Sequence, residues 1–312
     1  GYSPKEKGLA GAGAAFSQDA MAAAPNPSGM AYVCERMEIG ASLFSPSRKY
    51  TVTGTPPAPN GTPVFSGAPS TANCNFPHPS GNGACTPPFS VNPGSVDSEN
   101  ELFLIPHFAF NWQLDSESTA GIAVYGNGGM NTEYEGGSAT ASDQTFTIND
   151  DLPGTYGAGT AGVNLEQLFL NISFAKKMND KHVLGASLIL AGQRFAAQGL
   201  ENFGSFSVDP DNMSGNVHST SYGAGLKIGY QGEVADNLRV GVSYQSKISM
   251  GEFEEYKGLY AEGGDFDIPS TYTLGVSYNV ADKGTIVADI QRINYSEIAA
   301  IGNPISNVSN GG

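Results

Sequence analysis

Four cations in the second half of the chain could do the simplest chemistry, which is to bind an anion. Arg194, Lys227, Arg239 and Lys247 all fall in stretches where apolar and polar residues alternate, and the alternation predicts that they point inward with the polar set. A guanidinium or ammonium group in that position could receive the carboxylate of an otherwise apolar ligand. The alternative is that the four cations only line a polar wall.

Aromatic side chains gather in two long connecting segments, 195–217 and 251–268. Rings in these segments could capture an apolar ligand with low affinity. Anchoring at a lipid interface is the competing interpretation, because aromatic side chains also form girdles at membrane surfaces. The candidates are Phe195, Phe203, Phe206, Phe253, Tyr256, Tyr260 and Phe266.

No motif for catalysis or metal binding accompanies these residues. The chain contains no GxSxG, HExxH or CxxC pattern. Its four histidines are scattered as His78, His107, His182 and His218. We therefore expect no enzyme activity, no metal and no cofactor.

The charge balance argues against nucleic acid as a partner. The net charge is -15 at pH 7, whereas phosphate binding requires a surface of Lys and Arg. Much of the acid lies in segments 128–163 and 251–268, where solvated loops are the simple interpretation. The more specific interpretation is that divalent cations bridge these loops to lipopolysaccharide phosphates.

Three cysteines bear on the compartment. Cys74 and Cys85 share one segment rich in Pro, Gly and Asn, close enough for a disulfide that an oxidising compartment would permit. Cys34 is left unpaired, and we expect it to be a small buried residue rather than a reactive thiol.

The elements that must position these side chains are nine stretches of period-two alternation. We expect strands near 31–45, 101–114, 118–127, 165–176, 182–194, 218–232, 237–250, 269–281 and 284–296. In the clearest stretch one face is apolar and the other polar. The apolar face is Leu238, Val240, Val242, Tyr244, Ile248 and Met250, and the polar face is Arg239, Ser243, Gln245, Lys247 and Ser249.

Connections between these strands alternate between tight turns and long loops, the loops being 46–99, 128–163, 195–217 and 251–268. A transmembrane β-barrel with short periplasmic turns and long extracellular loops shows this alternation of connection lengths, whereas nothing in a soluble sandwich requires it. An odd number of strands is unexpected for such a barrel, since an unclosed sheet leaves edge amides in lipid. We therefore expect that the C-terminal part of the barrel is missing from this sequence.

Residues 1–30 are different, because they are rich in Ala and Gly and show no alternation. Small residues permit the close backbone packing that a segment threaded through a confined lumen needs. A flexible N-terminal tail is the alternative.

Four groups of residues, in this order along the chain, resemble the FadL/TodX family of outer-membrane transporters for hydrophobic compounds. Gly11–Gly13, Asp19–Ala20 and Asn26-Pro27-Ser28-Gly29-Met30 are similar to the family's hatch segment and its Asn-Pro-Ala-Gly-Met signature, with Ser28 in place of Ala. The other groups are Pro106 with Trp112, Gly121 and Thr132–Tyr134; Tyr222–Leu226 with Gly241–Ile248, where Gln245 replaces a common Arg; and Asp267–Ser270 with Gly275–Tyr278.

The resemblance implies an all-β transmembrane barrel of fourteen strands, about nine of them present here. It implies a hatch of residues 1–30 inside the lumen and a wall of residues 31–312. It also implies lateral exit of the ligand at a kink in the third strand, where Gly126, Gly128 and Gly129 fit a bulge. An ordinary loop start is the alternative for these glycines.

Passive uptake of fatty acids or hydrocarbons across the bacterial outer membrane is therefore the expected function. The expected partners are a hydrophobic small molecule, outer-membrane lipid and lipopolysaccharide, and the sequence leaves the oligomeric state open. The alternative is a structural or adhesive surface barrel without a transport role, whose acidic loops meet other molecules.

Overall fold

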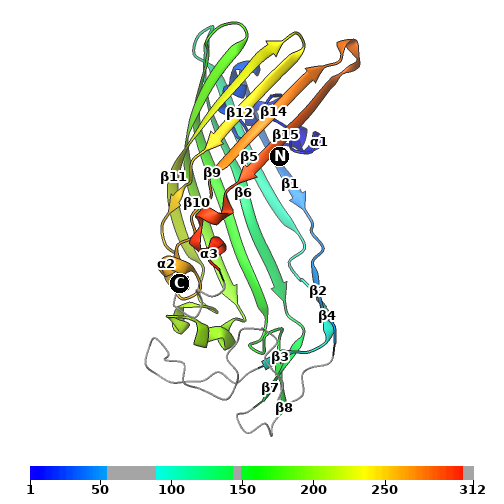
Figure 1. The fold of residues 1–312 in the computed structure, drawn as a ribbon, viewed down its shortest axis with the longest axis vertical. Coiled ribbons are helices and arrows are strands. Elements are labelled where there is room, and N and C mark those ends of the chain that lie inside the picture. Colours follow the sequence, from blue (N-terminus) through cyan, green and yellow to red (C-terminus); the bar gives the residue numbers. More distant parts are fainter. Residues whose placement is uncertain (55–88, 143–148, 305–312) are drawn as a thin grey trace.

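A long curved antiparallel sheet dominates the structure, and the N-terminal segment packs against its inner side (Figure 1). The computed structural model describes residues 1–54, 89–142 and 149–304. The expected disulfide between Cys74 and Cys85 lies outside the described residues, as does His78. Cys34 is exposed and free, so the expectation that it is buried is wrong.

The main sheet, here called the wall, runs in chain order and is antiparallel throughout. One strand corresponds to each of the nine predicted stretches, and β13 (Ser249–Met250) adds a short extra pairing with β11. The wall strands in order are β1 (Arg36–Phe44), β5 (Phe103–Gln113), β6 (Ser118–Tyr134), β9 (Ala161–Lys177), β10 (His182–Gln198), β11 (Ser219–Ala235), β12 (Leu238–Gln245), β14 (Thr271–Asn279) and β15 (Thr285–Ile293).

Several wall strands extend beyond the predicted boundaries. β6 stays paired with β9 as far as Tyr134 and Ala161, inside the segment expected to be a loop from 128 to 163. β10 likewise continues to Gln198, paired with β9. Each extension is stabilised by the partner strand, which pattern reasoning on one strand at a time does not include.

The long connections lie at one end of the sheet and the tight turns at the other (Figure 1). Short strands and helical turns occur in and beside these connections, and the short strands pair with one another rather than with the wall. The strands are β2 (Lys49–Val52), β3 (Phe89–Val91), β4 (Gly94–Asp97), β7 (Ser138–Ser142) and β8 (Asn149–Pro153). The helical turns there are η3 (Glu201–Phe206), η4 (Pro210–Asn212), η5 (Glu254–Tyr256), α2 (Ala261–Gly264), η7 (Tyr295–Glu297) and α3 (Ala299–Gly302). One further turn, η6 (Ala281–Lys283), lies in the tight turn between β14 and β15.

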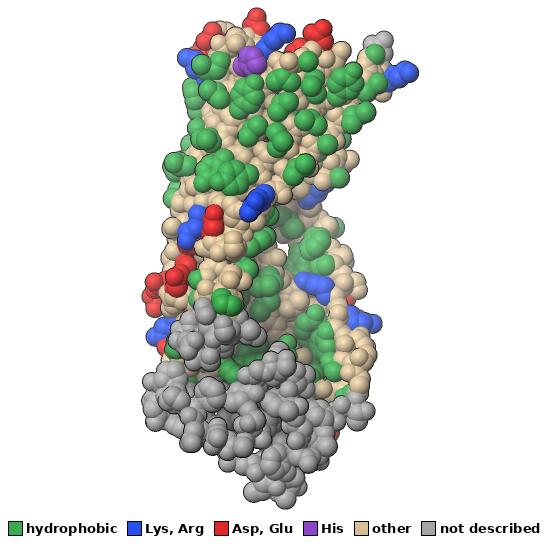
Figure 2. Space-filling model, in the orientation of Figure 1, with side chains coloured by type: hydrophobic (Ala, Val, Ile, Leu, Met, Phe, Trp, Pro, Cys, Tyr) green, Lys and Arg blue, Asp and Glu red, His purple; other side chains and the backbone are tan. Residues whose placement is uncertain are grey.

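Burial across the wall is inverted relative to a soluble protein. On β11, Leu226 is 60% exposed while the next residue, Lys227, is 6% exposed. Figure 2 shows apolar side chains over the outer surface of this part of the sheet. On β14 and β15, for example, Leu274 is 49% exposed and Ile290 is 75% exposed. An apolar outer face with a polar inner face is the pattern of strands that meet lipid. Among the described residues, no helix has the length and apolar character to cross a membrane.

The predicted facing is wrong at the end of the stretch 237–250. Ile248 and Met250 were expected outside with Val242, but both are buried inside, and Ser249, expected on the inner face, is exposed. The cause is one extra residue after β12: Lys227 of β11 lies opposite Gln245, yet Ala224 lies opposite Ser249. Because side chains alternate with period two, a single extra residue exchanges the two faces.

Val242 and Ser243 test this facing in the middle of β12. Val242 is 43% exposed on the outer side, whereas Ser243 is buried and donates a hydrogen bond from Oγ to the Pro25 carbonyl oxygen. Val242→Arg is expected to lower the unfolding free energy by about 2–4 kcal/mol, the cost of such a cation near the bilayer midplane. Ser243→Ala should cost about 1 kcal/mol. Denaturant unfolding in lipid vesicles measures both, and equal costs would contradict the assigned facing.

Candidate functional site

The N-terminal segment, residues 1–32, is folded into short helical turns inside the wall. They are α1 (Pro4–Gly8), η1 (Ala20–Ala23) and η2 (Pro27–Tyr32). The side chains of Ser3, Asp19 and Asn26 each accept a backbone N–H at the start of one turn, which satisfies donors that a short helix leaves unpaired. Most of residues 20–30 are buried, so the segment fills space enclosed by the wall.

Asn26 ties this segment to two wall strands. Its fully buried amide nitrogen donates to the carbonyl oxygens of Ala14 at 2.8 Å, Tyr230 at 3.0 Å and Val242 at 3.4 Å. Its amide oxygen accepts the Ser28 hydroxyl at 2.7 Å and the Ser28 N–H at 3.2 Å. An amide supplies two N–H donors and an acceptor oxygen from one side chain, whereas a carboxylate in the same place could not donate. Pro27, Gly29 and Met30 complete the turn and are buried too.

Two glycine pairs in the wall form the surface on which the segment rests. Gly185 lies opposite Gly229, and Gly241 lies opposite Gly275. A Cβ atom on Gly229 would meet Asn26 Oδ1 at 1.9 Å, and one on Gly241 would meet the Ala14 carbonyl oxygen at 1.9 Å. Sequence reasoning missed these residues, although glycines at inward positions of four consecutive strands are a detectable signal of close backbone approach.

Charged and polar wall side chains add further contacts to the segment. Asp289 Oδ2 accepts the backbone N–H groups of Gly13 and Ala14, both at 2.9 Å. Lys227 Nζ donates to the Ala24 carbonyl oxygen at 2.5 Å. The Arg239 guanidinium lies over the ring of Tyr32, 4.0 Å from its centre. Two of the four predicted cations therefore contact the N-terminal segment.

A buried acid lies within the segment. Glu6 accepts the Tyr2 backbone N–H at 2.7 Å and is 6% exposed. Burial raises its pKa to about 7, because the enclosed site disfavours the carboxylate form.

The wall splits between β5 and β6. Their ladder ends at the pair His107 and Tyr125, although β6 remains paired with β9 up to Tyr134. At the same point Asn127 is an extra residue on β6, between Gly126 opposite Leu168 and Gly128 opposite Gln167. The glycines predicted to form a kink, Gly126, Gly128 and Gly129, thus lie at a β-bulge beside the split.

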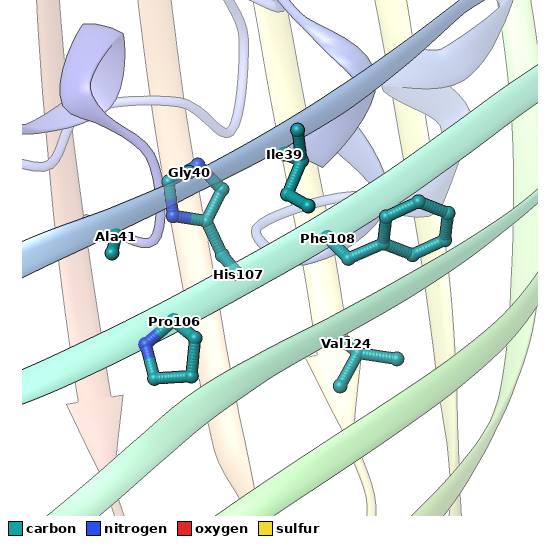
Figure 3. Close-up of a pocket in the computed structure, with 7 residues that line it drawn as sticks. All are labelled: Ile39, Gly40, Ala41, Pro106, His107, Phe108 and Val124. Atoms are coloured by element: carbon teal, nitrogen blue, oxygen red, sulfur yellow. The ribbon is translucent and has the colours of Figure 1, made fainter.

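An apolar hollow of about 490 Å³ opens on the outer face where the two strands separate (Figure 3). It is lined mainly by outward side chains such as Ile39, Pro106 and Val124. On the inner side of the split, the Tyr2 and Tyr125 rings lie 4.5 Å apart. Tyr2 also donates from its hydroxyl to Asn127 Oδ1 at 3.4 Å, so the start of the N-terminal segment reaches the bulge.

Five rings form an aromatic cluster toward the end with the long connections. Phe195, at the centre, lies 4.9 Å from the Tyr256 ring, 4.9 Å from Tyr260 and 5.5 Å from Phe253. Phe266 completes the cluster by contact with Phe253 and Tyr260. The end of β10 and segment 251–268 are thereby joined, which sequence spacing did not predict.

Two aromatic candidates lie outside this cluster. Phe203 packs edge to face on Tyr156 with ring centres 5.2 Å apart. Phe206 is 39% exposed.

The remaining two cations are both exposed, and each has a side-chain partner. Arg194 is exposed between the buried Gln193 and Phe195, and its guanidinium contacts His218 Nε2 at 3.1 Å. The expectation that Arg194 points inward is therefore wrong. Lys247 Nζ pairs with Asp267 Oδ2 at 2.5 Å.

Comparison with known proteins gives a family match and a fold match. Residues 2–310 match the family model for outer membrane protein transport protein (OMPP1/FadL/TodX). No curated protein sequence matches the chain. A solved FadL homologue from Pseudomonas aeruginosa is 17% identical with a TM-score of 0.58, over 92% of this chain and 67% of that one.

Two toluene transporters give similar values. TbuX of Ralstonia pickettii is 18% identical with a TM-score of 0.60, over 95% of this chain and 72% of that one. TodX of P. putida is 15% identical with a TM-score of 0.59, over 92% and 69%. These likenesses confirm the predicted all-β barrel fold.

Proposed function

Because the chain belongs to the OMPP1/FadL/TodX family of outer membrane transport proteins, we propose that it carries hydrophobic small molecules across the bacterial outer membrane by lateral exit through its wall. The ligand is captured at the aromatic cluster, enters the lumen beside the N-terminal segment, and leaves between β5 and β6. No chemical step on the ligand is part of this proposal.

The observation that carries the proposal is the early end of the β5–β6 ladder. β6 remains in register with β9 up to Tyr134, yet it has no β5 partner beyond Tyr125. Backbone N–H and C=O groups without partners are costly in lipid, so an interruption in the wall needs a reason. A path for an apolar molecule from lumen to bilayer is such a reason, and the hollow lined by Ile39, Pro106 and Val124 extends that path on the membrane side.

The other two parts of the site fit the same route. The aromatic cluster lies close to the long connections, where a ligand from outside arrives first, and its half-buried rings Tyr260 and Phe266 are the ones that a ligand can reach. The N-terminal segment lies across the lumen, held by Asn26 and Asp289, and obstructs a straight aqueous path. An apolar ligand gains more from sideways release into lipid than from release into water.

Deletion of Asn127 tests the route. It removes the extra residue and allows Gly126 and Gly128 to continue one regular strand, so the split should close. Uptake of a labelled aromatic hydrocarbon or fatty acid by cells that display the full-length variant should fall to the level of cells without the protein. The double variant Gly128→Val, Gly129→Val should reduce uptake in the same direction, since β-branched residues favour a regular strand.

Asn127→Ala is the matched control, because it keeps the extra residue and removes only the side chain. We expect it to transport like the unmodified protein. If the deletion variant is displayed at the surface and transports at the original rate, lateral exit at this bulge is wrong. A purely structural or adhesive barrel would give no uptake above background even without substitution.

A further inference from the structure

We propose that this chain selects uncharged apolar ligands over carboxylates of the same carbon skeleton, because the four cations that the alternation predicts to point inward are each paired, covered or turned outward. The inference rests on the proposed function and names the substrate class of the same route. It concerns Arg194, Lys227, Arg239 and Lys247, the residues from which the sequence allowed a carboxylate site.

Lys247 precedes the cluster residue Phe253 by six positions, and it is already paired with a carboxylate. Its Nζ lies 2.5 Å from Asp267 Oδ2. Asp267 is 5% exposed, and its other oxygen accepts the Met250 backbone N–H at 2.7 Å. Because that second bond holds the carboxylate in place, a ligand carboxylate would have to compete with a fixed internal partner for Lys247.

The surroundings of the aromatic cluster are acidic. Segment 251–268 contains six carboxylates and one lysine, Lys257. That lysine pairs with Asp209 at 3.2 Å. Burial together with the nearby Asp267 raises the pKa of Asp265 to about 6, so Asp265 still carries negative charge at pH 8. A carboxylate bound among these rings would therefore meet like charge.

The other three cations offer no alternative partner. Arg194 is exposed on the outer side of β10 and contacts His218. Lys227 is buried beneath the N-terminal segment, where it donates to the Ala24 carbonyl oxygen. Arg239 is covered by the Tyr32 ring.

Transfer from water explains the selection. A carboxylate that enters an apolar site without a cation loses its hydration and gains no compensating partner, whereas an uncharged group of similar size loses little. The aromatic cluster provides apolar contact to both kinds of ligand equally. The difference between them therefore comes from the charge alone.

A matched pair of ligands tests the proposal. Lauryl alcohol and laurate share one alkyl chain and differ in charge, and calorimetric titration of the full-length protein in lipid nanodiscs at pH 8 gives both dissociation constants. We expect the alcohol to bind at least about tenfold more tightly, a difference of about 1.4 kcal/mol. Equal or tighter binding of laurate overturns the proposal. If neither ligand binds, the proposed function itself fails, and the selectivity falls with it.

Two variants locate the cause. Asp267→Asn keeps an oxygen that accepts the Met250 N–H but releases Lys247, so laurate should bind at least about tenfold more tightly while the alcohol is unchanged. Adding Lys247→Met to that variant should remove the gain. In the otherwise unmodified protein, Lys247→Met should leave laurate binding unchanged. A marked loss of laurate affinity in that single variant would show that Lys247 already receives the carboxylate, and would overturn the proposal.

Discussion

Replacing Gly229 with valine is expected to displace the N-terminal segment and open an aqueous pore while the wall stays folded. Even the first added carbon would lie 1.9 Å from Asn26 Oδ1 and 2.9 Å from Pro27 Cδ, distances that packed atoms do not tolerate. The hydrogen bonds of Asn26 to the wall would be lost with the contact, each worth about 0.5–1.5 kcal/mol. Valine itself suits a strand, so pairing with β10 and β12 should persist.

Planar-bilayer recordings of the full-length protein measure this effect as ion conductance. The unmodified protein should remain closed, and Gly229→Val should conduct. Gly192→Val is the matched control: Gly192 is also a wall glycine, but a carbon added there has only the Tyr222 ring as neighbour, at 3.5 Å. A closed Gly229→Val channel with normal strand content would contradict the contact between the N-terminal segment and the glycine pairs.

The second large effect is expected at the centre of the aromatic cluster. Phe195 is fully buried against Phe253, Tyr256 and Tyr260, so Phe195→Ala should cost about 3–5 kcal/mol of local packing free energy. Segment 251–268 should then detach from β10 and become sensitive to added protease. Binding of an aromatic hydrocarbon should weaken in parallel, because the capture surface is lost.

Phe206→Ala removes the same side chain from an exposed position and is expected to change neither readout. Limited proteolysis with mass spectrometry follows the segment, and titration of the hydrocarbon follows the binding. If Phe195→Ala leaves segment 251–268 protected and the hydrocarbon affinity intact, the cluster neither holds the segment nor captures the ligand.

The amino-acid sequence by itself determined the number and order of the wall strands and the facing of most of their residues. These features are local: alternation with period two reports which side of a strand is apolar, and turn residues report where two strands meet at a tight turn. The alternation by itself predicts that Leu226 is exposed on the outer face and that the next residue, Lys227, is buried on the inner face. The role of the β6 glycines as a kink was predicted from the family resemblance and not from the alternation pattern.

Only the tertiary structure decided the features that depend on a partner strand. One extra residue after Gln245 turns Ile248 inward, and the pairing of β11 with β13 is what reveals it. The partners of the cations were equally invisible, because Asp267, His218 and the Tyr32 ring reach them through register and chain folding. Alternation states which side chains share a face. Whether a charge on that face is free or neutralised depends on contacts between segments far apart in the chain, and no local pattern contains them.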